Sequence, residues 1–233
     1  MIFIINLSKS IERKEFIKSQ FSKLKENDRS INYEFFPAIN GKDNPNFYLF
    51  DKYNEKKRFI RKGNVMSLSQ LGCFASHYLL WEKCIELNTG IIILEDDAIL
   101  QNNFLDIYKF CGSDSNQSEF FWLSPPAFET LKGNEKIKID NANKLIRFTG
   151  KHDNATGYYL TPKAAKKLLD HCQEWIYEVD ITMDRFWENH LDILNVAPPC
   201  IKPSFEFNTN IDVDKNKKNR TLKIKLGAVL DND

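Results

Sequence analysis

The chain has 233 residues, enough for one α/β domain with a substantial buried core but too few for two unrelated full-size domains. Its 33 lysines and arginines nearly balance its 32 aspartates and glutamates, so net charge gives no reason to expect nucleic acid as a partner. The five cysteines are widely spread and form no Cys-x-x-Cys pair, which argues against a disulfide framework or a zinc site.

The N-terminal residues 1–5 are apolar, but they are too few for a signal sequence and carry no basic segment before them. We therefore expect a first strand there, followed by a helix that Ser8 or Ser10 caps and that extends to about Glu26. No apolar stretch approaches the length of a membrane-spanning helix. Together with the unpaired cysteines, this predicts a reducing compartment, most simply the cytoplasm.

A second strand is expected at residues 33–39, and the Asn-Gly pair at residues 40–41 supplies turn chemistry after it. Residues 42–64 are polar, aromatic and rich in helix-breaking residues, so we predict a long loop there. Ser67 and Gln70 then have the spacing of a capping box, which predicts the start of a helix.

The most informative stretch joins the apolar run 91–94 to three acidic residues, Glu95, Asp96 and Asp97. A continuous apolar run indicates a strand buried on both faces, and in open α/β sheets ligands bind outside the carboxyl ends of the strands. Strand alternation would place Glu95 and Asp97 on one side and Asp96 on the other. Crowded carboxylates raise one another's pKa, and oxygen ligands suit Mg²⁺ or Mn²⁺ bound together with phosphates. The stretch predicts a metal and phosphate site; for an acid pair taken alone, a solvated strand end is the commoner alternative.

Further strands are expected at residues 120–124 and 191–196, each of which precedes a pair of prolines. One helix begins at Thr161 with proline at its first position, and another begins at Asp180 and continues to about His190. The alternation of strands and helices predicts an α/β fold with a largely parallel, Rossmann-type sheet flanked by helices.

Six short blocks, taken in order, resemble glycosyltransferase family 25. The blocks are Asn6-Leu7 with Arg13, Phe36 to Gly41, Gly72 to His77 with Trp81, Leu94 to Ala98, Gly157 to Leu160, and Val179-Asp180. That family contains bacterial lipopolysaccharide and lipooligosaccharide β-galactosyltransferases and, more distantly, collagen galactosyltransferases. The resemblance implies a GT-A fold, a nucleotide-sugar donor that is most often UDP-galactose, a divalent metal that is usually Mn²⁺, and inversion at the anomeric carbon.

By this resemblance, the donor contacts Asn6, Leu7, Arg13, Ala38, Ile39, Gly41, Glu95, Asp96 and Asp97. Glu95 and Asp97 would hold Mn²⁺ or Mg²⁺, which neutralises charge on the departing diphosphate, and Asp96 would orient the donor sugar or a metal-bound water. The alternatives are a solvated helix residue for Arg13 and a simple turn for Gly41. A third protein ligand stays open, with His190 and Asn208 as candidates.

An inverting transfer needs a carboxylate that takes the proton of the acceptor hydroxyl. Asp180 is our candidate for this catalytic base, and helix capping is the structural alternative for that residue. Asp153, Glu178 and Asp184 are the reserve candidates.

The acceptor is expected near His77, Asp153, Thr156, Gly157 and Tyr158, with Trp122 and Trp175 as further candidates for stacking on sugar rings. Without the resemblance, we would interpret His77 as a core histidine with satisfied hydrogen bonds. Most aromatic residues are expected in the core.

We expect one catalytic domain at residues 1–211 and a basic tail at residues 212–233 that is flexible or could approach anionic lipid from the cytoplasmic side. The expected partners are a UDP-sugar and a lipid-linked oligosaccharide acceptor, without nucleic acid. A noncatalytic sugar- or nucleotide-binding α/β module is the alternative function. A receiver-type signalling domain fits less well, because its acid pair ends the first strand rather than a later one.

Overall fold

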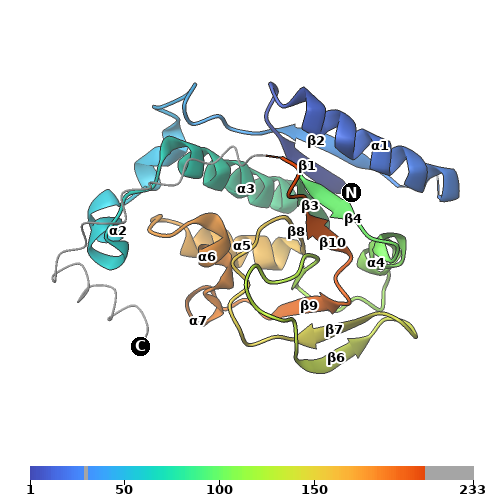
Figure 1. Ribbon diagram of the computed structural model, residues 1–233. Coiled ribbons are helices and arrows are strands. Elements are labelled where there is room, and N and C mark those ends of the chain that lie inside the picture. Colours follow the sequence, from blue (N-terminus) through green and yellow to red (C-terminus); the bar gives the residue numbers. More distant parts are fainter. Residues whose placement is uncertain (29–30, 208–233) are drawn as a thin grey trace.

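The computed structural model describes residues 1–28 and 31–207, which form a central sheet with helices on both faces (Figure 1). This confirms the predicted α/β class and its GT-A-like layering. The basic tail predicted at residues 212–233 lies outside the described residues. None of the helices in the described part combines the length and apolar character that crossing a membrane requires.

The eight-stranded sheet has the order β2-β1-β3-β8-β5-β9-β7-β6. Its strands are β1 (Ile2–Asn6), β2 (Tyr33–Pro37), β3 (Ile91–Glu95), β5 (Phe120–Trp122), β6 (Asn134–Lys138), β7 (Lys144–Arg147), β8 (Gly157–Leu160) and β9 (Ile193–Ala197). Strands β2, β1 and β3 run parallel, and β5 and β9 also run parallel. Strand β8 lies antiparallel between β3 and β5, and β7 and β6 add an antiparallel edge, so the sheet is mixed. A separate antiparallel pair joins β4 (Ala98–Leu100) and β10 (Ile201–Pro203).

The helical segments connect these strands across both faces. They are α1 (Ile11–Asn27), the 3₁₀ helix η1 (Tyr48–Lys52), α2 (Glu55–Lys62), α3 (Leu68–Leu87), α4 (Phe104–Cys111), α5 (Pro162–His171), α6 (Val179–Asp184) and α7 (Phe186–Asn189). The capping box predicted for Ser67 and Gln70 is present at the start of α3, and Thr161 caps α5 through its side chain. Both signals therefore predicted a helix start correctly.

Strand alternation divides the core into two clusters, one on each face of the sheet. Ile91 and Ile93 of β3 face the cluster that α3, α5 and α6 cover, whereas Ile92 and Leu94 face the cluster under α1 and α4 (Figure 1). All four residues are at most 2% exposed. The apolar run was thus correctly interpreted as a strand buried on both faces.

The predicted loop at residues 42–64 is wrong in part, because it contains η1 and α2. The two apolar residues of α2, Phe59 and Ile60, are adjacent and exposed, and the helix buries Arg58, so its sequence has no apolar stripe of the kind that predicts a core-facing helix. The helix predicted from Asp180 to His190 is divided into α6 and α7, and Glu178 rather than Asp180 occupies the N-cap position of α6. Strands β4 and β10, helix α4 and the β6–β7 hairpin were not predicted. In the hairpin, β6 is mostly exposed, so its sequence lacks an alternating apolar pattern.

Candidate functional site

A pocket of about 150 Å³ opens where β1 and β3 end. The chain passes from β1 through α1 to β2 on one side, and it returns through α3 to β3 on the other side of β1. The strand order therefore reverses between β1 and β3, and ligands of open α/β sheets bind at such a reversal. The pocket is lined by Ile5, Leu7, Arg13, Ala38, Ile39, Asn40, Gly41, Ser69, Cys73, Ser76, Glu95, Asp96 and Asp97. Every predicted donor-binding residue except Asn6 is in this set.

Asp96 is tied to the α1 side of the sheet. Its side chain accepts hydrogen bonds from Asn6 Nδ2 and Arg13 Nη1, both at 2.7 Å, and the residue is 6% exposed. Burial raises the pKa of Asp96, although the hydrogen bonds from Arg13 and Asn6 offset part of this effect. Both carboxylate oxygens are thus engaged, and Asp96 joins the ends of β1 and β3 to the first turns of α1.

Glu95 faces the opposite side, as strand alternation predicts. Its Oε1 lies 3.4 Å from Nε2 of His77 on α3, and its backbone N–H donates to the carbonyl of Thr156 at 2.9 Å. His77 is fully buried, and its Nδ1 lies 2.9 Å from the hydroxyl of Tyr158, which also accepts a hydrogen bond from Trp81 Nε1. The Glu95 carboxylate is therefore next to a buried aromatic network beneath the pocket.

Asp97 has the chemistry expected of a cation ligand. Burial and the nearby charges of Glu95 and Asp96 raise the pKa of Asp97 to about 7, against the opposing effect of Arg13 at 3.6 Å. Its Oδ1 is buried and makes no hydrogen bond within the described part of the chain. An unpartnered buried carboxylate oxygen is costly unless a donor or a cation satisfies it. Glu95 and Asp97 thus fit a divalent ion with oxygen ligands such as Mn²⁺ or Mg²⁺.

The opposite wall of the pocket is the segment 38–41, which packs directly on α3. A Cβ atom on Gly41 would lie 1.9 Å from the carbonyl oxygen of Leu68, and one on Gly72 would lie 2.4 Å from that of Ile39. The backbone N–H of Ile39 donates to Ser76 Oγ at 2.9 Å. The two glycines are therefore required for close backbone packing, which holds the segment at the pocket.

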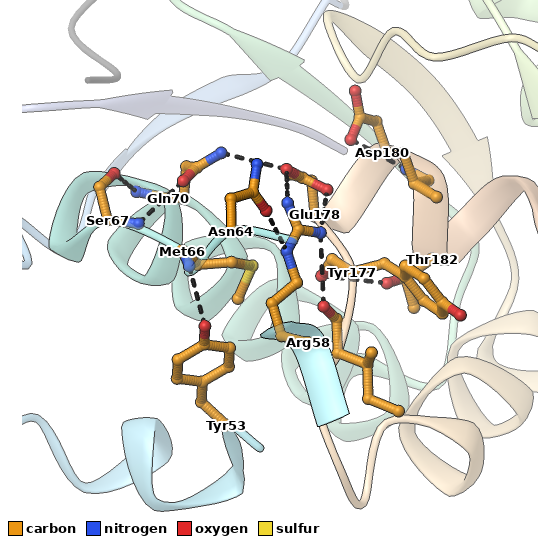
Figure 2. Close-up of polar contacts among 12 residues, drawn as sticks. Tyr53, Arg58, Asn64, Met66, Ser67, Gln70, Tyr177, Glu178, Asp180 and Thr182 are labelled. Atoms are coloured by element: carbon orange, nitrogen blue, oxygen red, sulfur yellow. Dashed lines mark hydrogen bonds and ion pairs between the residues drawn. The ribbon is translucent and has the colours of Figure 1, made fainter. Parts of the chain in front are cut away.

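Asp180 lies at the start of α6, apart from the polar network around Glu178 (Figure 2). Burial, which the hydrogen bond from the Ile181 N–H only partly offsets, raises the pKa of Asp180 to about 7, and Glu178, Asp153 and Glu95 add to the shift. The charge of Glu95 reaches Asp180 even though the two residues come from opposite halves of the chain. The structure therefore brings the candidate base to the same region as the acidic strand end.

Glu178 has a partner that Asp180 lacks. Arg58, which is 2% exposed, donates to both carboxylate oxygens of Glu178 at 2.6 and 2.7 Å, and Gln70 donates at 3.2 Å (Figure 2). Burial favours the neutral form, but these contacts lower the pKa of Glu178 below its ordinary value. Glu178 is therefore held as a carboxylate and is a weak candidate for the base. The reserve candidate Asp184 accepts a hydrogen bond from the His152 N–H, and burial raises its pKa to about 6.

The residues predicted for the acceptor are mostly enclosed. Thr156 is 4% exposed and Tyr158 is fully buried, whereas Gly157 pairs with Leu94 in the sheet. Asp153 is half-buried, with a left-handed backbone at φ 47°. Trp122 and Trp175 are each 1% exposed and belong to the core. An acceptor contact with these residues stays a prediction. Trp122 lines a separate pocket of about 130 Å³ together with His152 and Asp184.

The two candidates for a third metal ligand are not resolved by the geometry. His190 is exposed at the C-cap of α7, where its carbonyl accepts a hydrogen bond from Lys167. Asn208 lies outside the described residues.

Sequence reasoning missed the polar pocket-wall residues Asn40, Ser69, Cys73 and Ser76, and it placed the apolar Ile5 only in a strand. For Cys73 a signal was present, because it precedes His77 by four residues on a predicted helix and such residues share one face. Asn40 and Ser76 lie beside predicted site residues and Ser69 is in the first turn of α3, but none of the three has chemistry that distinguishes it in the sequence.

Comparisons with known proteins point to one family. The model of glycosyltransferase family 25, described as an LPS biosynthesis protein family, matches residues 1–183. The chain is 28% identical over 178 residues to lipooligosaccharide biosynthesis protein lic2B of Haemophilus influenzae, covering 72% of this chain and 62% of that protein. It is 28% identical over 199 residues to a glycosyltransferase 25 family member of Anopheles gambiae, covering 81% of this chain and 32% of that protein. The chain thus spans less than two thirds of the length of these relatives.

Proposed function

Because the chain belongs to glycosyltransferase family 25, we propose that it transfers a hexose, most simply galactose from UDP-galactose, onto a lipooligosaccharide-type glycan with inversion of configuration. Two relatives named for lipooligosaccharide biosynthesis, lic2B and lex-1 of Haemophilus influenzae, support the choice of acceptor class. The observation that carries the proposal is the buried, unpartnered Oδ1 of Asp97 beside Glu95 in the pocket at the ends of β1 and β3.

The residues of the pocket supply binding and charge. Glu95 and Asp97 would hold a divalent ion, which would neutralise negative charge on the departing diphosphate. Arg13 lines the same pocket and is placed to attract the phosphates of the donor. Asp96 fixes Arg13 and Asn6, so its role in donor binding is to keep the pocket in shape.

Asp180 removes the proton of the acceptor hydroxyl as that oxygen attacks the anomeric carbon. A general base is most effective when its pKa lies near the working pH, and the pKa of Asp180 is raised to about 7. Asp153 contributes to this shift and extends the acidic region on the acceptor side. The attack and the departure of UDP then occur on opposite faces of the sugar.

The first test is metal-dependent binding of UDP, measured as a shift in the melting temperature. We expect UDP to stabilise the protein with Mn²⁺ present, and chelator to remove the effect. Asp97→Asn and Glu95→Gln should each weaken UDP binding in Mn²⁺ by about tenfold or more, since loss of even an outer partner of a metal ligand costs about 10–100-fold. Asp170→Asn, in an exposed ion pair with Lys166, is the matched control and should bind normally.

The second test is a screen of nucleotide sugars for release of UDP, with and without glycan acceptors. Turnover that requires Mn²⁺ and prefers UDP-galactose supports the proposal. Stabilisation by free glycan alone, without turnover of any donor, supports the noncatalytic sugar-binding module instead.

A further inference from the structure

A second set of candidate metal ligands lies at the inner wall of the donor pocket. Cys73 and His77 are four residues apart on α3 and share one helix face, and Glu95 extends toward them from the end of β3. The Cys73 sulfur, a ring nitrogen of His77 and a carboxylate oxygen of Glu95 all lie within 4.8 Å of one another. Within residues 1–28 and 31–207, these three side chains form the group of cysteine, histidine and acidic residues whose ligand atoms lie close enough together to bind one ion.

The nitrogen of His77 that faces this group, Nε2, lies 3.4 Å from Oε1 of Glu95. His77 is fully buried, and its Nε2 makes no hydrogen bond in the described part of the chain. A buried polar atom without a partner costs about 1–3 kcal/mol. The other ring nitrogen, Nδ1, is held by the Tyr158 hydroxyl at 2.9 Å. Metal-binding histidines have this arrangement, with one nitrogen on the ion and the other fixed by an outer partner.

The ligand types select a class of ion. Sulfur, imidazole nitrogen and carboxylate oxygen together suit Zn²⁺, which is bound by protein thiolates and imidazoles in tetrahedral sites. Mg²⁺ and Mn²⁺ prefer oxygen ligands and gain little from a cysteine. We propose that Cys73, His77 and Glu95 form a zinc site that overlaps the donor pocket. The Cys73 thiol loses its proton to solvent as the Zn–S bond forms, and water takes the fourth position on the ion.

This site departs from the expectation that the cysteine spacing gave. The absence of a Cys-x-x-Cys pair excludes the common zinc motifs, but here one cysteine and one histidine come from a helix and the third ligand comes from a strand. Only the folded chain brings them together.

Zinc at this site would inhibit the transferase, a consequence that rests on the proposed function. Glu95 belongs both to the zinc site and to the Glu95–Asp97 pair proposed for Mn²⁺. Two dications that share the Glu95 carboxylate repel each other and divide its charge, so we expect Zn²⁺ to weaken binding of the Mn²⁺–UDP complex. Glu95 is therefore the residue through which zinc would control donor binding.

The experiment uses Co²⁺ as a spectroscopic substitute for Zn²⁺, added to the whole chain in a metal-free reducing buffer. We expect an ultraviolet charge-transfer band from a cobalt–thiolate bond, which Zn²⁺ then displaces with a stoichiometry of one per chain. Cys73→Ser should remove the band and weaken zinc binding by about tenfold or more. Cys111→Ser changes another half-buried free cysteine and should keep both, which makes it the matched control.

Further variants separate this proposal from the proposed function. Asp97→Asn should keep the cobalt band but lose the UDP-dependent shift in Mn²⁺, whereas Cys73→Ser should lose the cobalt band, and the UDP shift that it retains should be insensitive to zinc. A band in a chain that never responds to UDP supports the zinc site and rejects the transferase assignment. Absence of the band in the folded wild type, or its persistence in Cys73→Ser, overturns the zinc site. Zinc binding that leaves the UDP shift unchanged overturns the competition through Glu95.

Discussion

Two carboxylates at the start of α6, those of Glu178 and Asp180, have pKa values shifted in opposite directions. On the side toward α2, Glu178 receives two hydrogen bonds from the buried Arg58, which lower its pKa despite burial (Figure 2). On the side toward the acidic strand end, Asp180 accepts a hydrogen bond from the neighbouring Ile181 N–H, and burial raises its pKa to about 7. The two residues are only two positions apart in the sequence. The presence or absence of Arg58 as a partner, rather than the local sequence, therefore decides which carboxyl group is ionised.

We infer from this difference that Glu178 stabilises the fold and that Asp180 takes part in the chemistry. Glu178 and Arg58 connect the start of α6 with α2, and Gln70 adds a contact from the first turn of α3. Asp180 takes no part in these contacts, and carboxylates with pKa values raised in this way gather at functional sites. The ion pair between Glu178 and Arg58 thus fixes the backbone that positions Asp180.

The largest effect is expected for Asp180→Asn. Removal of a general base costs a factor of about 10²–10⁴ in rate, so release of UDP from the donor should fall by about a thousandfold. The same change should stabilise the fold at pH 8. The folded-state pKa of Asp180 lies above its unfolded value, so the folded protein loses stability as pH rises from about 4 to about 7, by at most about 4 kcal/mol. Activity and denaturant unfolding measured on one preparation check both signs.

Asp184→Asn is the control for that variant, because Asp184 also has a raised pKa but its Oδ2 accepts a hydrogen bond from the His152 N–H. Asparagine can accept the same hydrogen bond, so activity should change little. A large loss of activity in Asp184→Asn together with an active Asp180→Asn would reassign the base.

The second effect in size is loss of stability in Arg58→Met. Breaking a buried ion pair by removing one partner costs about 3–5 kcal/mol, because the other charge is left uncompensated. The Glu178 side chain is 24% exposed, so we expect the free energy of unfolding to fall by about 3 kcal/mol, measured by denaturant unfolding. The double variant Arg58→Met/Glu178→Gln should recover part of this cost. Full additivity of the two single changes would show that the pair contributes nothing.

Much of this fold could be predicted from local sequence. The apolar run at residues 91–94 and the caps at Ser67 and Thr161 depend on neighbours along the chain, and the structure confirms all three. Helix α2 could not be predicted in the same way, because its buried residue is a charged Arg58 whose partner Glu178 is 120 residues away.

The candidate site likewise combines features that the local sequence predicts with features that arise only in the folded chain. The positions of Glu95, Asp96 and Asp97 at a strand end follow from the sequence, and the resemblance correctly grouped most of the pocket wall. What the sequence does not contain is the environment of each side chain. Asp96 is engaged by Asn6 and Arg13 while Oδ1 of Asp97 is unpartnered, and this difference arises only when β1, α1 and β3 meet.

A third, smaller effect is expected in the pH dependence of activity. If Asp180 is the base, kcat/KM should fall about tenfold per pH unit below pH 7, as the carboxylate is protonated. The charge of Glu178 contributes to the raised pKa of Asp180, so Glu178→Gln should move this acid limb to lower pH. A merely structural role for Glu178 would lower activity at all pH values without moving the limb.

The smallest effect should come from Lys57→Met, which sharpens the contrast with Arg58. The two residues are neighbours on α2, and both bind a glutamate near the start of α6: Lys57 pairs with Glu174 at 2.6 Å. The Lys57 and Glu174 side chains are 52% and 40% exposed, whereas Arg58 is 2% exposed. Exposed pairs gain little in water and lose side-chain entropy, so we expect a change of about 0.3 kcal/mol in the free energy of unfolding. A cost as large as that of Arg58→Met would mean that the ion pairs of α2 stabilise the protein regardless of burial, and that the difference between Glu178 and Asp180 has another cause.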